Sequence, residues 1–513
     1  MENEYILEMK NIVKCFPGLM ASRNVNFAVR PGEVHALLGE NGAGKTTLMN
    51  ILYGLYQQDA GEIFITGVKR NIRSPRDAIA AGIGMVHQHF MLVPTLTVME
   101  NVILGLDNGL KPLNRRQATE KVLQLSSKFN FKIDPNALVR DLSVGAQQRV
   151  ELIKALYRGA ELLILDEPTA VLTPLEVQEL FVILRQFVAM GKSVIFISHK
   201  LWEVMEISNR VTVLRTGERV NVVDTNRTTK EELAAMMVGR NVVMDYDKTS
   251  IPCQDFRIEL KNINAVGDVP VSSLKNVSLG VRRGEIVGVA GVDGNGQKEL
   301  AEAVMGLRSI QEGKVLFDGK EINTISTRER MTMGMAHIPE DRLKQGLVLD
   351  FTVAENMALD VYDHPPLTVK GVFYPGVMAE LSKQLVREFD VRPPRHDVPV
   401  RNFSGGNQQK VVLAREISRE PQFILAVQPT RGLDIGATEF VHRRLLAEKE
   451  KGVGILLVSA DLDEVLLVSD RVVVIYEGKI MGEFIPGKAS MTEIGLMMGG
   501  TKRVNKAGEC TCS

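Results

Sequence analysis

The stretch that decides the fold of this protein is GENGAGKTT, Gly39 to Thr47. It matches G-x-x-x-x-G-K-[ST], the pattern of a phosphate-binding loop. The apolar run VHALL, Val34 to Leu38, precedes it and predicts a buried strand. Apolar residues after it recur at i, i+3, i+4 and i+7, which predicts a helix with one apolar stripe: Leu48, Ile51, Leu52 and Leu55. A strand before the glycines and a helix after them are the context that this motif requires.

The residue types in this loop suit an anionic ligand. Glycines let backbone N–H groups approach a phosphate without a Cβ in the way, and the start of the following helix adds positive potential. Lys45 is predicted to reach the β- and γ-phosphates of a nucleotide, and the Thr46 hydroxyl to ligate Mg²⁺. The predicted nucleotide contacts are Gly39, Glu40, Asn41, Gly42, Ala43, Gly44, Lys45, Thr46 and Thr47. The alternative, a glycine-rich turn with an unrelated lysine, is disfavoured by the length of the match in this context.

Composition narrows the class of protein. A length of 513 residues predicts two large domains or about three of ordinary size. Lys plus Arg and Asp plus Glu both number 62, so the net charge gives no argument for binding nucleic acid or an anionic membrane. No apolar run is long enough to cross a membrane and the N-terminus lacks a signal peptide, so we expect the chain in the cytoplasm. The four cysteines are scattered or terminal and suggest neither a zinc site nor a disulfide framework.

A long internal repeat organises the rest of the chain. GEVHALLGENGAGKTTL at Gly32 reappears as GEIVGVAGVDGNGQKEL at Gly284, an offset of 252 (284 − 32). Later blocks, DLSVGAQQRV with Ser143 and NFSGGNQQKV with Ser404, are offset by 261 (404 − 143). The second copy therefore carries nine extra residues (261 − 252), which we expect around residues 364–376.

Each copy has the length of one α/β domain. We predict domains at 1–240 and 257–500, a linker at 241–256 that lacks periodicity, and a tail at 501–513. Within each copy, short apolar strands such as the one from Leu162 alternate with amphipathic helices. This alternation predicts the α/β fold class, a mostly parallel sheet flanked by helices with ligand chemistry at the carboxyl ends of the strands.

Three further motifs of the first copy follow the phosphate loop in order. They are LSVGAQQ from Leu142, LLILDEP from Leu162 and ISH from Ile197. This ordered set resembles the signature, the acidic Walker B strand and the switch histidine of ATP-binding-cassette (ABC) ATPases, and the resemblance covers both copies. It implies two tandem P-loop NTPase domains of the ABC type, each with a mostly parallel sheet and a helical subdomain, and ATP and Mg²⁺ as cofactors.

The resemblance gives roles to several residues of the first copy. Asp166 and Glu167 end an apolar strand, where Asp166 is expected to hold Mg²⁺ and Glu167 to orient or deprotonate the attacking water. Gln88 matches the Q-loop ligand of Mg²⁺ and water, His199 matches the switch histidine that contacts the γ-phosphate, and Phe16 fits the aromatic residue that stacks on adenine. Each alone has a plainer alternative: a turn for the acidic pair, a surface position for Gln88, and core packing for His199 and Phe16.

The second copy has lost these catalytic residues. The substitutions are Gln297 for Lys45, Lys298 for Thr46, Glu340 for Gln88, Val427 for Asp166, Gln428 for Glu167 and Ala460 for His199. They remove a phosphate-binding cation, the metal ligands and the general base. We therefore expect the second copy not to hydrolyse ATP.

The second copy nevertheless keeps an intact signature, FSGGNQQK, and the aspartate of TRGLD, whereas the first copy has Val144 for Gly405 and Thr173 for Asp434. In the ABC family two domains pair head to tail, and the signature of one binds the γ-phosphate held by the phosphate loop of the other. The second-copy residues of the predicted site are Ser404, Gly405, Gly406, Gln408 and Asp434. All intact parts thus belong to one predicted hydrolytic site, which disfavours a second copy that is only a packing scaffold.

The tandem arrangement resembles the ATP-binding subunit of bacterial importers of the simple-sugar class, which includes nucleoside systems. The stretches GMVHQHFMLVPTLTVMEN and AVQPTRGLD look more like the nucleoside branch, so the resemblance implies an ATPase that energises nucleoside import, with simple-sugar import as the alternative. The implied partners are integral-membrane permease subunits and, through them, an extracellular substrate-binding lipoprotein. The chain would lie at the cytoplasmic face of a bacterial cell membrane, touching neither nucleic acid nor the transported substrate.

Two other classes of protein fit the sequence less well. A soluble two-cassette ATPase that acts on ribosomes or DNA is disfavoured because the predicted linker is short and no zinc spacing exists. A nucleotide-binding regulator without turnover is disfavoured by Glu167.

Overall fold

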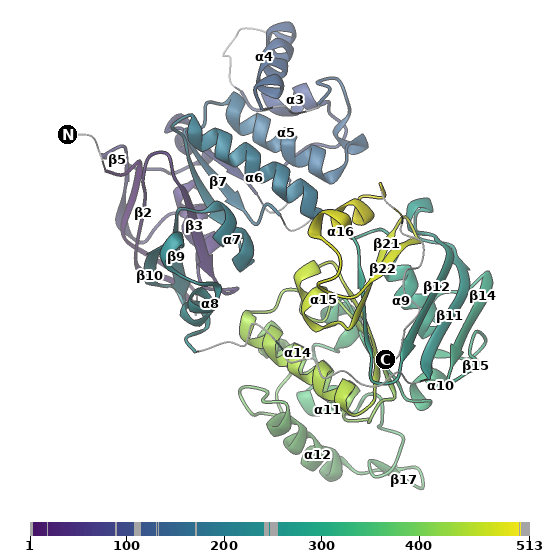
Figure 1. The fold of residues 1–513 in the computed structure, drawn as a ribbon. Coiled ribbons are helices and arrows are strands. Elements are labelled where there is room, and N and C mark those ends of the chain that lie inside the picture. The colour runs from purple at the N-terminus through teal and green to yellow at the C-terminus, as the bar shows by residue number, and fades with distance from the viewer. Residues whose placement is uncertain are drawn as a thin grey trace. The chain divides into compact units, whose positions relative to one another are not determined.

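The computed structural model divides the chain into two units, Met1–Val242 and Val243–Ser513 (Figure 1). It describes residues 4–17, 19–87, 90–106, 114–129, 131, 133–169, 172–240, 246, 255–501 and 503. Each unit is described by itself. Most of the predicted linker and tail lies outside the described residues, so the predicted domain limits stay predictions.

The described residues of the first unit form two sheets. A four-stranded antiparallel sheet has the order β2 (Leu19–Val29), β1 (Leu7–Phe16), β4 (Ala60–Ile65) and β5 (Val68–Arg70). A six-stranded sheet has the order β10 (Glu218–Asp224), β9 (Arg210–Arg215), β3 (Val34–Gly39), β8 (Ser193–Ile197), β7 (Leu162–Asp166) and β6 (Ile83–Val86). All its neighbouring pairs are parallel except β10 with β9. The parallel sheet was predicted from the sequence, and the antiparallel sheet was not.

The helices of the first unit pack against this parallel sheet or on one another. They are α1 (Lys45–Leu52), α2 (Pro75–Ala80), α3 (Val98–Ile103), α4 (Arg115–Lys128), α5 (Val144–Tyr157), α6 (Pro174–Ala189), α7 (Leu201–Ile207) and α8 (Lys230–Val238). Single 3₁₀ turns cover Val139–Asp141 and Thr225–Arg227. The helices α3, α4 and α5 pack on one another at one end of the unit and form a helical subdomain, as predicted (Figure 1).

The two faces of the parallel sheet bury different cores. On β7, Leu162 and Ile164 pack with α1 and the antiparallel sheet, while Leu163 and Leu165 pack with α5 and α6. Because successive side chains of a strand point to opposite faces, a strand buried on both sides is a continuous apolar run. This explains why β7 and β8 were readable from the sequence alone.

The second unit repeats this arrangement. Its antiparallel sheet has the order β12 (Leu274–Arg282), β11 (Phe256–Ala265), β14 (Glu312–Phe317) and β15 (Lys320–Glu321). Its mostly parallel sheet has the order β16 (Met335–Ile338), β19 (Phe423–Val427), β20 (Gly454–Ser459), β13 (Ile286–Ala290), β21 (Arg471–Tyr476) and β22 (Lys479–Phe484). The equivalent strands thus follow the same spatial order in both units, as the repeat predicts.

The helices of the second unit follow the same sequence, with additions. They are α9 (Gln297–Met305), α10 (Thr327–Thr332), α11 (Val353–Ala358), α12 (Pro375–Glu388), α13 (Gly405–Ile417), α14 (Ile435–Glu450), α15 (Leu462–Val468) and α16 (Met491–Met498). Single 3₁₀ turns cover Pro270–Ser272 and Val400–Asn402, and a π-helical turn covers Arg342–Gly346. A small hairpin joins β17 (Thr368–Val369) to β18 (Val372–Phe373).

One predicted helix is shorter than expected. Helix α1 ends at Leu52, and Leu48, Ile51 and Leu52 are fully buried. Leu55 lies outside the helix with 48% of its surface exposed, so its place in the apolar stripe was wrong. The chain leaves the helix at Gly54, whose φ of 79° is a left-handed conformation that ends helices.

The nine extra residues of the second unit are split. Asn101 accepts a hydrogen bond from the N–H of Val93 at 2.7 Å, and Asn356 accepts one from Val348 at 2.9 Å, which makes these pairs equivalent with an offset of 255 (356 − 101). Three extra residues (255 − 252) therefore precede Asn356, beside the π-helical turn, and only the rest fall toward the hairpin. The prediction of a single place at 364–376 was wrong for these three, because the turn's main chain gives no pattern in the sequence.

Candidate functional site

The predicted phosphate loop leaves a buried strand and opens a helix. All six residues of β3 are buried, and α1 begins at Lys45. Gly44 precedes the helix with φ 97°, and a Cβ at this position would overlap the carbonyl oxygen of Ala21. No side chain caps α1 and its first turn holds no acidic residue, so N–H groups at its start are available to an anion.

The side chain of Lys45 lies against the backbone of this loop. It is buried, and its Nζ donates to the carbonyl oxygens of Gly39 at 2.6 Å and Glu40 at 3.0 Å. Burial lowers the pKa of Lys45, while the charges of Glu167 and Asp166 act in the opposite direction. The ammonium group therefore sits between loop carbonyls and two carboxylates.

Asp166 ends β7 inside this site. Burial, followed by the charge of Glu167, raises the pKa of Asp166 to about 6, although Lys45 and a hydrogen bond from the Thr46 hydroxyl act to lower it. A buried carboxylate next to a second carboxylate and a hydroxyl is a donor set that suits a hard divalent cation, which would relieve the repulsion between the acids. Thr46 and Asp166 therefore fit the predicted Mg²⁺ ligands, while Gln88 lies outside the described residues.

Glu167 is held by its backbone and by His199. Its φ of 47° is left-handed, which is uncommon for a residue with a side chain, and its N–H donates to the carbonyl of Ile197 at 3.0 Å. Burial acts to raise the pKa of Glu167, but the hydrogen bond with His199 Nδ1 at 3.1 Å and the charges of His199 and Lys45 hold it below its usual value. Glu167 is therefore ionised at neutral pH, as a general base must be.

A buried glutamate that the sequence argument missed supports the His199 loop. Glu203 on α7 accepts hydrogen bonds from the hydroxyls of Ser198 and Thr169, both at 2.8 Å. Ser198 in turn accepts from the N–H of Lys200 at 3.1 Å. The same pair recurs in the second unit as Ser459 and Glu464, at 2.6 Å, so comparison of the two copies could have found it.

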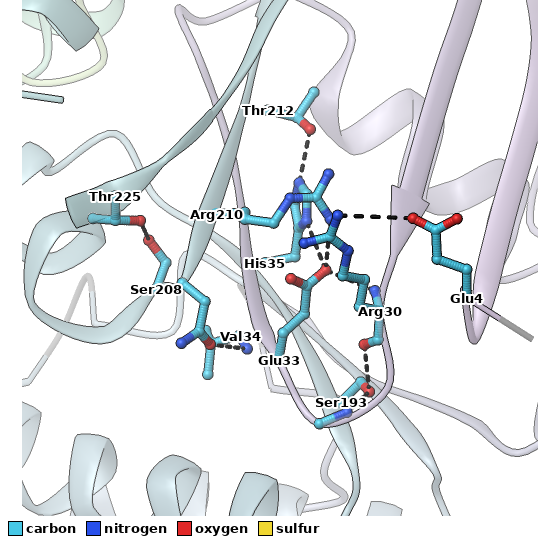
Figure 2. A network of polar contacts seen from close by, with 12 residues as sticks. Glu4, Arg30, Glu33, Val34, His35, Ser193, Ser208, Arg210, Thr212 and Thr225 are labelled. Atoms are coloured by element: carbon cyan, nitrogen blue, oxygen red, sulfur yellow. Dashed lines mark hydrogen bonds and ion pairs between the residues drawn. The ribbon is translucent and has the colours of Figure 1, made fainter. Parts of the chain in front are cut away.

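A second polar network lies at the base of β3 (Figure 2). His35 is fully buried, with Nδ1 3.1 Å from Glu33 Oε1 and Nε2 2.7 Å from the Thr212 hydroxyl. Glu33 also accepts from the N–H of Arg30 at 2.7 Å and from Arg210 at 3.2 Å. Burial, the largest influence, lowers the pKa of His35 and keeps the ring neutral. The network fixes the strand that carries the phosphate loop.

Phe16 lies at the end of β1 and is half-buried. Its ring meets Tyr56 edge to face, with centroids 5.5 Å apart, and Lys14 Nζ lies 5.6 Å from its centroid. The alternative of deep core packing does not describe this position. The adenine-stacking role stays a prediction.

In the second unit, side chains at the equivalent loop are hydrogen-bonded to groups of the same unit. Gln297 Nε2 donates to the carbonyls of Gly291 and Ser459, both at 3.3 Å, in place of an ammonium group. Lys298, which replaces Thr46, has no hydroxyl group for a metal ion. Its Nζ donates to Asp268 Oδ2 at 2.6 Å. The loop backbone is kept, but its side chains supply no cation to a phosphate.

Side chains also connect the other motif positions of the second unit. Gln428, which replaces Glu167, donates to Asp293 of the loop at 3.3 Å and accepts from the N–H of Ala460 at 3.3 Å. Arg431 of TRGLD pairs with Glu340 and lies 3.8 Å from Asp293. Positions that would surround a nucleotide are thus joined directly by hydrogen bonds and ion pairs.

The intact signature begins helix α13. Ser404 is exposed, and its hydroxyl accepts from Asn407 Nδ2 at 2.9 Å. Asp434 precedes α14 and accepts from the N–H of Ala437 at 2.7 Å. Gln408 is buried, and its amide donates to the carbonyl of Val400 at 3.3 Å, so the structure does not bring this predicted contact to the open start of the helix.

Comparison with known proteins identifies these units. The family model described as ABC transporter matches residues 22–170 and 274–431, more than half of the chain. The chain belongs to the ABC transporter family. Its two units are ABC cassettes, as predicted, and the ligand that such a cassette binds is ATP.

Three relatives of the two-cassette chain cover nearly its whole length. The guanosine import ATP-binding protein NupO of Bacillus subtilis is 47% identical over 98% of this chain and 99% of its own. The nucleoside import ATP-binding protein NupA of Lactococcus lactis is 45% identical over 98% and 99%. The glucose import ATP-binding protein TsgD13 of Haloferax volcanii is 44% identical over 98% and 96%.

Among the described residues, no helix of either cassette is both long and apolar enough to span a bilayer.

Proposed function

We propose that this chain is the ATP-hydrolysing subunit that drives import of a nucleoside through partner permeases. One observation carries the proposal for the chemistry: in the first cassette Lys45, Asp166, Glu167 and His199 converge at the end of the parallel sheet. The names of the guanosine and nucleoside import relatives support the cargo.

Each residue of the first cassette has one task in this proposal. Lys45 binds the β- and γ-phosphates, and Glu167 accepts a proton from the attacking water. His199 keeps the Glu167 carboxylate oriented through its hydrogen bond of 3.1 Å. Thr46, Asp166 and Gln88 would hold Mg²⁺, which neutralises charge on the phosphates when bound.

The proposal includes one hydrolytic site per chain. In this proposal the intact signature of the second cassette, from Ser404 to Gly406, contributes to binding the γ-phosphate, as in the ABC family. This part rests on the family resemblance and on the sorting of intact residues between the two cassettes. Binding of one ATP for each chain is the expected stoichiometry.

The catalytic assignment is tested by Glu167→Gln in the full-length chain. ATP binding should persist while phosphate release falls by roughly a hundredfold or more, because the general base is lost. Gln428→Ala at the equivalent position of the second cassette is the matched control and should leave the rate within about twofold. Wild-type turnover by the Glu167→Gln chain would show that another group activates the water.

Simple-sugar import is the second candidate, because a glucose import relative is 44% identical to this chain. Uptake of labelled guanosine and labelled glucose should be compared in cells with and without this chain. Loss of guanosine uptake alone supports the proposal. Loss of glucose uptake alone replaces the nucleoside with a sugar.

The proposed partners and location can be tested in the same cells. A tagged chain should sediment with the membrane fraction together with integral-membrane permease subunits, and a substrate-binding lipoprotein should be recovered through them. Recovery with ribosomes or with DNA, in place of the membrane fraction, would contradict the proposal and favour the soluble ATPase class.

A further inference from the structure

An arginine lies against the intact signature of the second cassette. Arg342 Nη1 donates to the carbonyl of Arg431 at 2.9 Å. A Cβ built on Gly405 would come within 2.6 Å of Arg342 Nη2, so this end of the guanidinium lies on the first glycine of the signature. The side chain therefore lies between the start of α13 and the TRGLD loop.

Hydrogen bonds at both ends of the π-helical turn Arg342–Gly346 fix the main chain that carries this arginine. Before the turn, Asp341 Oδ1 accepts from the N–H groups of Leu343 at 3.0 Å and Lys344 at 3.2 Å. At its end, the carbonyl of Gly346 accepts from the buried Arg415 of α13 at 2.8 Å. The three extra residues before Asn356 make this turn possible, and π-helical turns of this kind are frequent at functional sites.

The guanidinium of Arg342 is half-buried and incompletely bonded. Burial, the largest influence, lowers the pKa of Arg342, with the charge of Asp341 acting against it. Within the described part of the chain, no carboxylate lies at ion-pair distance from Arg342, and its buried Nε has no hydrogen-bond partner. A desolvated cation without a counter-charge costs free energy that a bound anion would recover.

The start of α13 also has donors for an anion. This helix has 13 residues, no side chain caps it, and its first turn contains no acidic residue. One carboxylate is near: Asp434 Oδ2 would lie 3.6 Å from a Cβ on Gly406, while its Oδ1 is engaged by Ala437. Arg342 therefore lies beside the first residue of this helix, and a carboxylate that is already hydrogen-bonded lies near the second.

The signature of the first cassette is built in the opposite way. Ser143 caps α5 by accepting from the N–H of Ala146 at 3.3 Å. A Cβ on Gly145 would overlap Oε1 of Glu176, so a carboxylate lies on the glycine that is equivalent to Gly406. Where the second cassette has Gly405, the first has Val144. The first signature helix thus has a carboxylate directly against its second residue, whereas the second signature helix has a guanidinium against its first residue and a carboxylate farther from its second.

We propose that Arg342 binds the terminal phosphate of the ATP that the second-cassette signature receives, and that Gly405 leaves the space the guanidinium needs to reach it. This inference rests on the proposed function of that signature. Arg342 makes a charge-assisted contact with ATP that ADP cannot make, because ADP lacks the terminal phosphate. This contact is therefore lost when ATP is hydrolysed and the phosphate leaves.

The test measures ATP and ADP affinity of the full-length chain in the Glu167→Gln background, where ATP persists. Arg342→Met should weaken ATP binding by roughly tenfold or more and leave ADP binding within about twofold. Arg342→Lys should recover part of the loss, since it keeps the charge without the planar fork. Gly405→Val, which copies the first cassette, should also weaken ATP binding. Lys344→Met removes a neighbouring positive charge and should change neither affinity.

The outcomes separate this inference from the proposed function. If Ser404→Arg weakens ATP binding and Arg342→Met does not, the role of Arg342 is overturned and the signature site stands. If neither variant changes ATP binding, the signature does not receive the nucleotide and both fail. If Arg342→Met and Arg342→Lys lower the thermal unfolding temperature equally while the ATP to ADP affinity ratio stays constant, Arg342 is structural and the inference is overturned.

Discussion

The two cassettes have the same strand order but use the end of the parallel sheet differently. In the first, Lys45 lies between loop carbonyls and the carboxylates Asp166 and Glu167. In the second, the amide of Gln297 donates to loop and strand carbonyls, and Gln428 connects Asp293 to Ala460. The second cassette thus joins these positions directly through its own side chains. The phosphate-loop backbone is kept where the neutral side chains of Gln297 and Gln428 replace a cation and a carboxylate.

The buried cores of the two cassettes also differ at one position, where a phenylalanine of the first corresponds to a histidine of the second. Phe181 of the first cassette packs edge to face on Phe196, with centroids 6.1 Å apart. Its equivalent, His442, is buried 3.1 Å from Glu464, which also accepts from the Ser459 hydroxyl. Glu464 thus pairs with His442 and Ser459, whereas its first-cassette equivalent Glu203 pairs with Thr169 and Ser198.

Exchanging the loop residues 45 and 297 tests the comparison most strongly. Lys45→Gln should lower turnover by roughly a hundredfold or more, because the phosphate charge loses its cation. Gln297→Lys should not create a second working site, since Val427 and Gln428 provide neither a metal ligand nor a base. Phosphate release and nucleotide stoichiometry measure both variants. Two ATP bound for each chain with doubled hydrolysis in Gln297→Lys would contradict the division of labour.

Arg330 tests whether the second cassette depends on a residue that the first lacks. Its guanidinium is fully buried and donates to the carbonyls of Val304 and Ile322, both at 2.6 Å, and of Ile325 at 3.0 Å, whereas the equivalent position holds Ala78. Arg330→Met should reduce the free energy of unfolding by about 3 kcal/mol or more, because buried carbonyls lose their donors.

The measurement for Arg330 is urea unfolding with hydrogen exchange resolved along the chain, which identifies the cassette affected. Arg328→Met is the control: Arg328 is exposed and pairs with Asp363 on the surface, so the loss should stay below about 1 kcal/mol. Equal losses for the two variants would mean that the buried bonds are not specific to the second cassette's stability.

The stability of the two cassettes should respond differently to acid, because His35 of the first cassette corresponds to Val287 of the second. The folded-state pKa of His35 lies below the ordinary value of 6.5, so the unfolded chain binds the proton more readily. The contribution of His35 to stability is therefore present above about pH 6.5 and is lost as the pH falls below it. His35→Val should flatten the dependence of first-cassette stability on pH between 7 and about 5.

The same variant should cost about 1–2 kcal/mol at pH 7, because Glu33 and Thr212 lose a buried partner. Thermal unfolding at several pH values measures both effects. The control is Val287→Ala in the second cassette, which should lower stability equally at every pH. An unchanged pH slope in His35→Val would assign the acid sensitivity to other groups.

The smallest expected difference concerns the two signature serines. Ser143 caps α5 with a hydrogen bond and Ser404 makes none to the backbone of α13. Ser143→Ala should lower the free energy of unfolding by about 1 kcal/mol, and Ser404→Ala by less than about 0.5 kcal/mol. Ser404→Ala should instead weaken ATP binding. Urea titrations and ATP titrations of both variants make the comparison.

The sequence by itself determined the architecture that depends on local pattern. The phosphate loop, the strand before it and the helix after it follow from glycine spacing and apolar periodicity, which are properties of neighbouring residues. The repeat at Gly32 and Gly284 determined that there are two cassettes. The losses at Gln297 and Gln428 could be found by aligning one copy on the other, without any structure.

Only the tertiary structure decided which side chains meet across long separations. Arg342 lies 63 residues before Gly405 (405 − 342), and Glu176 lies 31 residues after Gly145 (176 − 145), so no local pattern connects them. The place of Arg342 depends on the main-chain path of a π-helical turn, for which the sequence has no periodicity. Electrostatic character at a helix start is the sum of groups that the fold brings together, and this sum separates the two signatures although their sequences differ at few positions.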